Sequence, residues 1–585
     1  MEKRAHNQLA DGMTTPHALS RYIRAGLIAL PLLVGYILLG LFSNRGIDLT
    51  DESFYVLGYI SNLHSVAFPS SFFDLYRGLL GWLELDLAGM RWVRLILTAL
   101  SCWALSAGVR AHTKDRLPPS SYPYLYGLVF AGGLANYSWG PTAISYNSFT
   151  FVFLALTTSA WLMHGQTTSP TKRFFWEVAA GASIACLFMA RVPRGKLMLI
   201  TLGGFISATL YKRPFSITRA VWVVPGFTLG TLLITLLVFG NPENLTIELK
   251  RLIGLTSNSN ESNPNHGKSL PILYLRDMVR VIQNLWLPCV LVGSSLIIAR
   301  KRRIATSLTV WIPLIILAAT FVLFQSWQGG TAHKHRLIEI YAVILVYAIT
   351  VHFSQDAPPL RNWALILWLA CLPFAGAIGT SNILSGQLMF YMPFLTGALF
   401  LLLADSPQRQ ILPAVTGLVI LTAFTQGTVS SLLHPYRASE NVFQQRSPLP
   451  IKGVLHGQKV SDQDLSLYQQ LAEFAEQDIE YLFTFRHQTG LHLLLDKKAL
   501  SADWMNENCV GRLCNIIRPP PIDPGNLLFI IPDTITLNEQ VAACLADKGI
   551  YFPRDYHMVK QAQYATAKGG PPVTLQVYLP RNSSN

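Results

Sequence analysis

Residues 24–55, RAGLIALPLLVGYILLGLFSNRGIDLTDESFY, place a long apolar run directly before a cluster of acidic side chains. The run from Arg24 to Phe42 can cross a bilayer as a helix, since about 20 apolar residues suffice for one span. Asp48, Asp51 and Glu52 follow at once, at the level of the membrane surface. Carboxylates near a membrane are costly and usually serve a function. The stretch therefore predicts a membrane protein with an acidic site just outside the bilayer.

The composition of the 585-residue chain is that of an integral membrane protein. Hydrophobic residues make up 51% of the sequence and charged residues only 13%, and the mean hydropathy is +0.34. Ordinary soluble domains carry about 25% charged residues. The net charge of +14 might suggest nucleic acid, but the basic residues form short runs between apolar segments. Such runs are a topology signal, so no nucleic-acid partner is expected.

Apolar windows of about 17 to 22 residues predict roughly thirteen membrane helices. The predicted centres lie near residues 32, 99, 131, 154, 182, 204, 230, 291, 315, 344, 370, 396 and 421. With the N-terminus inside, every even-numbered connection is basic, which is the bias of cytoplasmic loops. No small-residue cleavage pattern follows the first span, so it is expected to stay as an anchor. A multi-pass protein of a bacterial inner membrane is expected.

Three regions follow from these patterns. They are a cytoplasmic tail (1–21), a transmembrane domain (22–432) with a first outer loop (43–89), and an extracytoplasmic domain (433–585). The last region alternates the apolar runs IEYLFTF, GNLLFIIP and VTLQVYLP with a helical stretch, SDQDLSLYQQLAEFAEQ. The sequence thus predicts an α-helical polytopic membrane protein with a C-terminal soluble α/β domain. A local Cys509–Cys514 disulfide is one possibility in an oxidising compartment.

Two predicted outer loops carry positive charge against the usual bias. The basic residues are Arg191, Arg194 and Lys196 in ARVPRGK, and Lys334 and Arg336 in TAHKHRL. Guanidinium groups bind phosphate oxygens through paired, charge-assisted hydrogen bonds. These side chains are candidates for a phosphate site, with contact to anionic lipid headgroups as the alternative.

The first outer loop carries a resemblance to a known family. It opens with the Asp51-Glu52 pair, continues with Ser-Phe-Tyr, and leads to the Arg-rich segment Met90-Arg91-Trp92-Val93-Arg94 at the next span. This pattern, with many spans before an outward soluble domain, resembles the polytopic C-type glycosyltransferases. That superfamily includes the protein O-mannosyltransferases and the lipid A aminoarabinose transferases. The resemblance implies transfer of a sugar from a polyprenyl-phosphate donor to a hydroxyl of a cell-envelope lipid or glycan.

The resemblance also implies roles for the acidic residues. Asp51 matches the catalytic base and Glu52 its partner, while Asp48, three residues upstream, competes for the same role. The base would take the acceptor proton as the new bond forms, which typically contributes about 10²- to 10⁴-fold in rate. Fixed positive charge would stabilise the departing phosphate, and a single displacement would invert the anomeric carbon. No cofactor is expected, and a divalent metal remains open.

Further polar residues are candidate contacts to the sugar or acceptor. Tyr146 and Asn147 lie in ISYNSF at an outer helix start, and His335 lies in the second basic loop. An aromatic belt at the membrane surface is the alternative explanation for the tyrosine.

Other classes of protein remain as alternatives at this point. A lipid or sugar transporter would place ionisable groups near the membrane midplane, often in two repeated halves. Here the charges collect at one face, and no internal repeat is found. An O-antigen polymerase or ligase would share a lipid-linked substrate and an outward Arg-rich site, without an acidic pair after the first span. The oligomeric state is not predicted.

Overall fold

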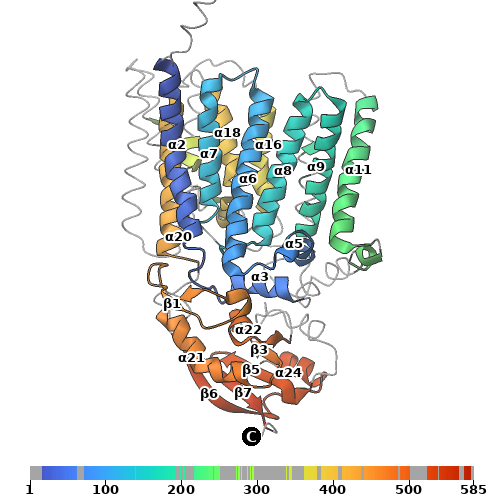
Figure 1. Cartoon of the computed structure of the whole chain (residues 1–585), viewed down its shortest axis with the longest axis vertical. Helices are drawn as coiled ribbons and strands as arrows, with labels where there is room; N and C mark the ends of the chain where they lie inside the picture. The colour runs from blue at the N-terminus through green and yellow to red at the C-terminus, as the bar shows by residue number, and fades with distance from the viewer. Residues whose placement is uncertain are drawn as a thin grey trace, which may run out of the picture.

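The computed structural model consists of a helical bundle and a smaller α/β unit stacked at one end of it (Figure 1). It describes residues 16–61, 71–138, 140–191, 217–241, 362–377, 384–405, 411–436, 440–484, 488–500, 523–537, 539–565 and 572–581, with short pieces between 198 and 345. The first outer loop lies where the bundle meets the α/β unit. Residues from both parts of the molecule can therefore contact one another there.

Long helices build the described part of the bundle. They are α2 (Pro16–Leu41), α6 (Leu87–Thr113), α7 (Tyr122–Ala135), α8 (Tyr146–Gln166), α9 (Pro170–Ala190), α11 (Ile217–Phe239), α16 (Trp363–Ala377), α18 (Met392–Ala404) and α19 (Leu412–Ala423). The last continues through a π-helical turn, Phe424–Val429, into α20 (Ser430–Leu433). Each covers a predicted span centre. The centres near 204, 291 and 315 lie outside the described residues.

Not every described helix is long enough to cross a membrane alone. Four are sufficiently long and apolar: Ile23–Leu41, Leu87–Thr113, Pro170–Ala190 and Leu412–Leu433. The helical class of the protein is therefore as predicted, whereas the count of about thirteen spans is not confirmed.

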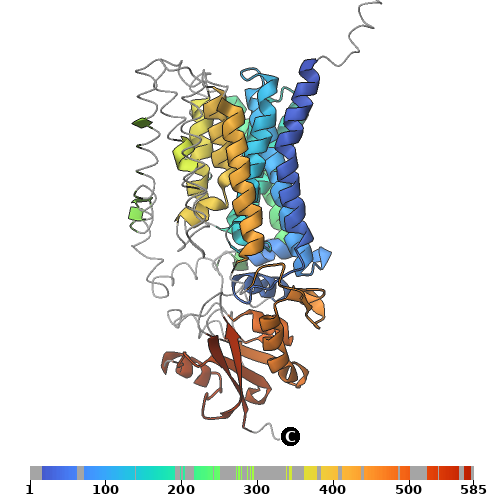
Figure 2. The same cartoon turned by 90° about the vertical axis from the view of Figure 1, so that its left-hand side faces the viewer.

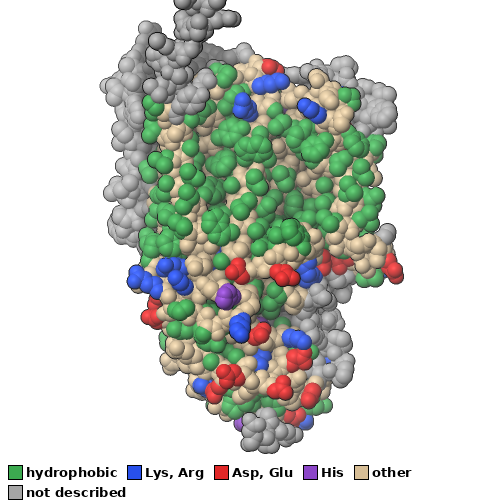
Figure 3. Space-filling view, in the orientation of Figure 1, with side chains coloured by type: hydrophobic (Ala, Val, Ile, Leu, Met, Phe, Trp, Pro, Cys, Tyr) green, Lys and Arg blue, Asp and Glu red, His purple; other side chains and the backbone are tan. Residues whose placement is uncertain are grey.

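The side of the bundle is an apolar band with charged groups at both of its ends (Figure 3). Large hydrophobic side chains point outward along it, with Leu27 67%, Trp103 58% and Phe175 60% exposed. Facing water, a surface of this kind would be strongly unfavourable, whereas hydrocarbon solvates it. The band is the surface that the bundle presents to lipid.

Glycines bring α9 and α11 into close backbone contact. A Cβ atom at Gly230 of α11 would lie 2.0 Å from the carbonyl oxygen of Val178, and one at Gly181 of α9 would lie 2.1 Å from that of Phe227. Small residues permit such approaches between helices in membranes. The contact fixes the position of α9, whose C-terminal end carries Arg191.

Two short helices lie across the end of the bundle, between it and the α/β unit (Figure 1). These are α3 (Asp51–Ile60) and α5 (Phe72–Leu80), both from the first outer loop. Phe72 and Phe73 of α5 are fully buried against α3, where their rings contact Tyr55 and Phe54 in edge-to-face geometry. Aromatic packing thus holds α3, with its acidic start, in a fixed place.

The C-terminal unit is a five-stranded mixed sheet with helices, as the sequence predicts. The strand order is β4 (Lys498–Ala499), β3 (Tyr481–Thr484), β5 (Leu527–Pro532), β7 (Pro572–Pro580) and β6 (Tyr556–Ala565). The first three strands are parallel, and the last two pair antiparallel. The helices are α21 (Asp462–Glu476), α22 (Gly490–Leu495) and α24 (Glu539–Ala546). Figure 2 shows α21 beside the sheet from a second side.

One cysteine of this unit is oxidised. Cys544 in α24 is disulfide-bonded, while Cys509 and Cys514 lie outside the described residues. The predicted Cys509–Cys514 pairing therefore stays a prediction.

Backbone hydrogen bonds join the C-terminal unit to the first outer loop. A small ribbon, β1 (Ser447–Pro448) paired with β2 (Lys459–Val460), lies beside residues 44–46. The Gly46 amide donates to the Lys459 carbonyl at 2.8 Å, and the Lys459 amide donates to the Asn44 carbonyl at 2.9 Å. The Gly490 amide of α22 donates to the Leu49 carbonyl, also at 2.8 Å. Residues 44–49, which precede the acidic pair, are therefore held by the C-terminal unit.

The glycine contact between α9 and α11 predicts a selective loss of stability. Gly230→Ala inserts a methyl group against backbone, and we expect it to lower the free energy of unfolding by about 1–3 kcal/mol. Gly417→Ala in α19 is the control, because nothing lies within 4 Å of its Cβ position; it should be neutral or slightly stabilising. Thermal unfolding in detergent micelles measures both. Equal midpoints for the two variants would contradict the close approach.

Candidate active site

Asp48 holds the start of α3. Its Oδ1 accepts hydrogen bonds from the Thr50 amide (2.9 Å) and hydroxyl (2.6 Å), and its Oδ2 accepts from the Glu52 amide at 3.0 Å. The Ser53 hydroxyl donates to the Asp48 carbonyl at 2.6 Å. A carboxylate at a helix N-terminus satisfies amides that have no partner within the helix and interacts favourably with the helix dipole. These contacts hold the first turn of α3 from a position two residues before its N-cap, Thr50.

Glu52 forms a buried ion pair with Arg91 of α6. Arg91 Nε donates to Glu52 Oε1 at 3.0 Å and Nη2 donates to Oε2 at 2.5 Å, and the two side chains are 7% and 2% exposed. Glu52 Oε1 also accepts from the Thr142 hydroxyl (2.9 Å) and the Ala143 amide (2.7 Å). Burial alone would raise the pKa of Glu52, but the Arg91 charge and these hydrogen bonds lower it below its ordinary value. Glu52 is therefore held as a carboxylate.

The Arg91 guanidinium also forms hydrogen bonds to the loop before α3. It donates to the carbonyls of Ser43 (2.7 Å), Arg45 (2.9 Å) and Gly46 (3.0 Å). Five hydrogen bonds thus join α6 to α3 and to residues 43–46. A buried charge pair is favourable only when its remaining donors and acceptors are satisfied in this way.

Arg94, one turn along α6, holds the loop between α7 and α8. It is 1% exposed and donates to Asn136 Oδ1 at 2.8 Å and to the Pro141 carbonyl. Its guanidinium lies 4.5 Å from the centroid of the Tyr137 ring. Residues 136–138 and 140–143, which carry the Thr142 and Ala143 partners of Glu52, are thereby fixed to α6.

Asp51 lies among tyrosines from three parts of the chain. Tyr436, which follows the last bundle helix, donates its hydroxyl to Asp51 Oδ2 at 2.5 Å. Tyr55 lies one turn after Asp51 in α3, and its ring centroid is 5.8 Å from that of Tyr146 at the start of α8. Burial raises the pKa of Tyr55 well above its usual value, and the neighbouring Tyr146 and Asp51 act in the same direction. Tyr55 therefore remains a neutral hydrogen-bond donor beside the carboxylate.

Arg191 completes this group on the far side of Tyr146. Its guanidinium lies 5.0 Å from the centroid of the Tyr146 ring, just beyond the C-terminal end of α9. Tyr55 and Tyr146 thus lie between two candidates from distant parts of the sequence, Asp51 and Arg191, at one end of the bundle. Asn147 is buried beside Tyr146 in the first turn of α8.

The other candidate residues are not placed by the structure. Arg194, Lys196, Lys334, His335 and Arg336 lie outside the described residues. Within the described ranges, no group of three His, Cys, Asp or Glu side chains gathers in a way that would hold a metal ion.

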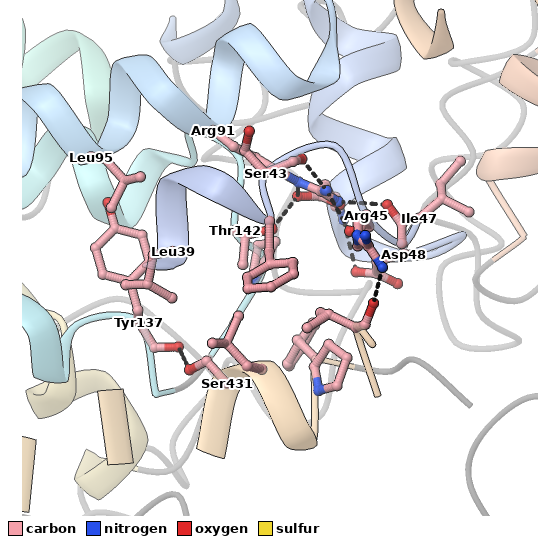
Figure 4. A pocket seen from close by; sticks show the side chains of 18 residues that line it. Leu39, Ser43, Arg45, Ile47, Asp48, Arg91, Leu95, Tyr137, Thr142 and Ser431 are labelled. Atoms are coloured by element: carbon pink, nitrogen blue, oxygen red, sulfur yellow. Dashed lines mark hydrogen bonds and ion pairs between the residues drawn. The ribbon is translucent and has the colours of Figure 1, made fainter. Parts of the chain in front are cut away.

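A small cavity lies on the other face of the acidic stretch, between α2, α6 and the segment after α20. It has about 60 Å³ of space, and its polar lining includes Asp48, Glu52, Arg91, Thr142 and Tyr436. Figure 4 shows Leu39, Leu95 and Tyr137 at one end of it, and Arg45, Ile47 and Asp48 at the other.

Several residues of the site had no signal in the sequence. Tyr436 stands 385 positions from Asp51, in a segment that reads as a connection between two domains. Thr142 lies in a short loop, and only its contact with Glu52 distinguishes it. Arg91 and Arg94 were visible as an Arg-rich helix start, but their different partners depend on the fold.

Comparison with known proteins gives a distant structural likeness. Two crystal structures of ArnT from Cupriavidus metallidurans, one in the apo state and one bound to undecaprenyl phosphate, align with 94% of this chain and 98% of theirs. The TM-scores are 0.41 and 0.38, and the sequence identity is 13% in both cases. No protein-family model and no curated protein matches the sequence. At this distance the function has to be argued from the chain's own residues.

The ion pair predicts a large and pH-dependent stability loss. Glu52→Gln leaves the Arg91 charge buried without a counterion, and we expect a loss of about 3–5 kcal/mol. Because the pKa of Glu52 is lowered, its contribution is present above the ordinary value of 4.5 and is lost as the pH falls below it. Chemical unfolding at pH 7 and pH 4 would show the difference shrinking at acid pH.

The matched control is Asp74→Asn. Asp74 pairs with Arg77 at 2.6 Å, but both side chains are about a quarter exposed. Such a pair is worth about 1 kcal/mol or less. Equal losses for Glu52→Gln and Asp74→Asn would show that burial of the Glu52 pair does not matter.

Proposed function

We propose that this protein is a membrane glycosyltransferase that moves a sugar from a polyprenyl-phosphate donor to a hydroxyl of an extracytoplasmic acceptor. The observation that carries the proposal is the group formed by Asp51, Tyr55, Tyr146 and Arg191 at one end of an apolar bundle. It joins a carboxylate, aromatic rings with hydroxyl donors, and a guanidinium. These are the groups that proton removal, sugar binding and phosphate binding require.

Asp51 is proposed as the base. The acceptor oxygen attacks the anomeric carbon while the bond from that carbon to the phosphate oxygen breaks. The acceptor proton passes to the Asp51 carboxylate, and the phosphate leaves with the bonding electrons. A lipid phosphate is a good leaving group and needs no acid to protonate it, so one carboxylate suffices, whereas glycosidases use a pair. A single displacement inverts the anomeric configuration.

Arg191 is proposed to bind the donor phosphate. A polyprenyl chain lies in the hydrocarbon and carries its phosphate at the surface, which is the level at which α9 ends. Positive charge there stabilises the phosphate as its charge develops. Arg194, Lys196, Lys334 and Arg336 remain proposed members of the same basic site. Asn147 and His335 remain proposed sugar or acceptor contacts.

Asp48 and Glu52 are proposed to position the base rather than to act on substrate. The hydrogen bonds of Asp48 hold the first turn of α3, and Glu52 is neutralised by Arg91. Both side chains thereby hold the start of α3, the helix that carries Asp51.

The proposed setting is a bacterial inner membrane with the site outside. The disulfide of Cys544 suits an oxidising compartment. The opposite end of the bundle carries Lys and Arg side chains (Figure 3), as cytoplasmic ends do. A transporter is less well supported, because Asp51 and Arg191 lie at the end of the bundle rather than at its midplane. A cell-envelope lipid or glycan is the proposed acceptor class.

Purified protein should release polyprenyl phosphate from one of a panel of polyprenyl-phosphate sugars when envelope lipids are supplied as acceptors. Asp51→Asn should lower the rate about 10²- to 10⁴-fold, because it removes the base. Asp48→Asn should keep most of the activity, because the Asn side-chain oxygen can still accept a hydrogen bond at the start of α3. Mass spectrometry of the lipid products measures both. Turnover by Asp51→Asn at the wild-type rate would contradict the assignment.

Binding of polyprenyl phosphate tests the phosphate site without turnover. Arg191→Met should weaken binding about tenfold, in line with loss of a charge-assisted hydrogen bond. Arg173→Met is the control, because Arg173 lies at the opposite end of α9 and its side chain bonds the Thr167 carbonyl. Equal affinities of the two variants would exclude Arg191 from the site.

A further inference from the structure

The segment after the last bundle helix folds back onto the first outer loop. The Val442 amide donates to the Leu432 carbonyl at 2.9 Å, and Arg45 Nη1 donates to the Val442 carbonyl at 3.2 Å. The Phe443 ring lies 5.1 Å from that of Phe42 at the end of the first span, in edge-to-face geometry. These contacts fix the path of the segment that carries Tyr436.

The C-terminal unit holds the start of α3 from the opposite side. Helix α22 packs against α3, and a Cβ atom at Gly490 would lie 2.7 Å from Leu49 Cα and 2.9 Å from Ser53 Oγ. Nothing larger than glycine fits there without a shift of the backbone. Asp51 therefore lies between α22 and the segment that carries Tyr436. Both follow α20 in the sequence.

Tyr436 bridges this region and the acidic stretch. Its hydroxyl donates to Asp51 Oδ2, and its side chain also lines the cavity beside Asp48 and Glu52. Hydrogen bonds to an ionised group are roughly twice as strong as neutral ones. This contact therefore fixes the rotation of the Asp51 carboxyl group.

We propose that Tyr436 is a positioning residue for the Asp51 base, an inference that rests on the proposed function. The Tyr436 hydroxyl donates to Oδ2 and holds the Asp51 carboxyl group in one orientation toward the acceptor hydroxyl. The C-terminal region thus takes part in catalysis through the orientation of the base.

Steady-state transfer kinetics test the inference. Tyr436→Phe should lower kcat about tenfold and leave KM for the donor unchanged, because the contact orients the base and does not bind the donor. The control is Tyr556→Phe, which removes a tyrosine hydroxyl that donates to the Pro524 carbonyl at 3.0 Å in the C-terminal unit. A wild-type kcat in Tyr436→Phe would overturn the inference.

A double-mutant cycle separates this inference from the proposed function. Thermal midpoints of Tyr436→Phe, Asp51→Asn and the double variant should be non-additive if the two side chains are bonded. Additive shifts would overturn the inference. A non-additive cycle in a protein that turns over no donor would support the contact and reject the glycosyltransferase. Turnover abolished by Asp51→Asn but unchanged by Tyr436→Phe would reject only the role of Tyr436.

Discussion

The buried ion pair between Glu52 and Arg91 is the interaction on which the rest of the site depends. It joins the first outer loop to α6, and through Thr142 and Ala143 it also holds the loop before α8. Taking two charges out of water costs several kcal/mol per ion, which only a fully hydrogen-bonded geometry offsets. Arg91 donates five hydrogen bonds, and Glu52 also accepts from Thr142 and Ala143. Together these hydrogen bonds supply that geometry. The ion pair therefore fixes the position at which α3 begins.

The position of α3 determines what Asp51 can contact. On one side the helix packs through aromatic rings against α5 and against Tyr146 of α8, and Arg191 lies over the same tyrosine. On the other side the C-terminal unit bonds residues 44–49 and supplies Tyr436. The carboxylate therefore lies where the helical bundle and the C-terminal unit meet. That position suits a reaction between a donor anchored in lipid and an acceptor outside it.

The sequence predicted the membrane helices and the α/β unit because both depend on local pattern. Apolar runs give helices wherever backbone groups must be satisfied within lipid, and IEYLFTF, GNLLFIIP and VTLQVYLP contain three of the strands of the sheet. The acidic cluster was visible for the same reason, as charge beside an apolar span. The separate functions of its members were not visible, since Asp48 and Glu52 differ from Asp51 only in their partners. Tyr436 and Thr142 reach the site through tertiary folding alone, which no local pattern records.

The central claim is that Asp51 acts on substrate whereas Glu52 acts through the fold. The most direct test is the single-turnover release of polyprenyl phosphate by Asp51→Asn and Glu52→Gln, each normalised to the folded fraction of the preparation. The account predicts that folded Glu52→Gln retains at least about a tenth of the wild-type rate, while Asp51→Asn falls about 10²-fold or more. A folded Glu52→Gln that is inactive beside an active Asp51→Asn would contradict the account.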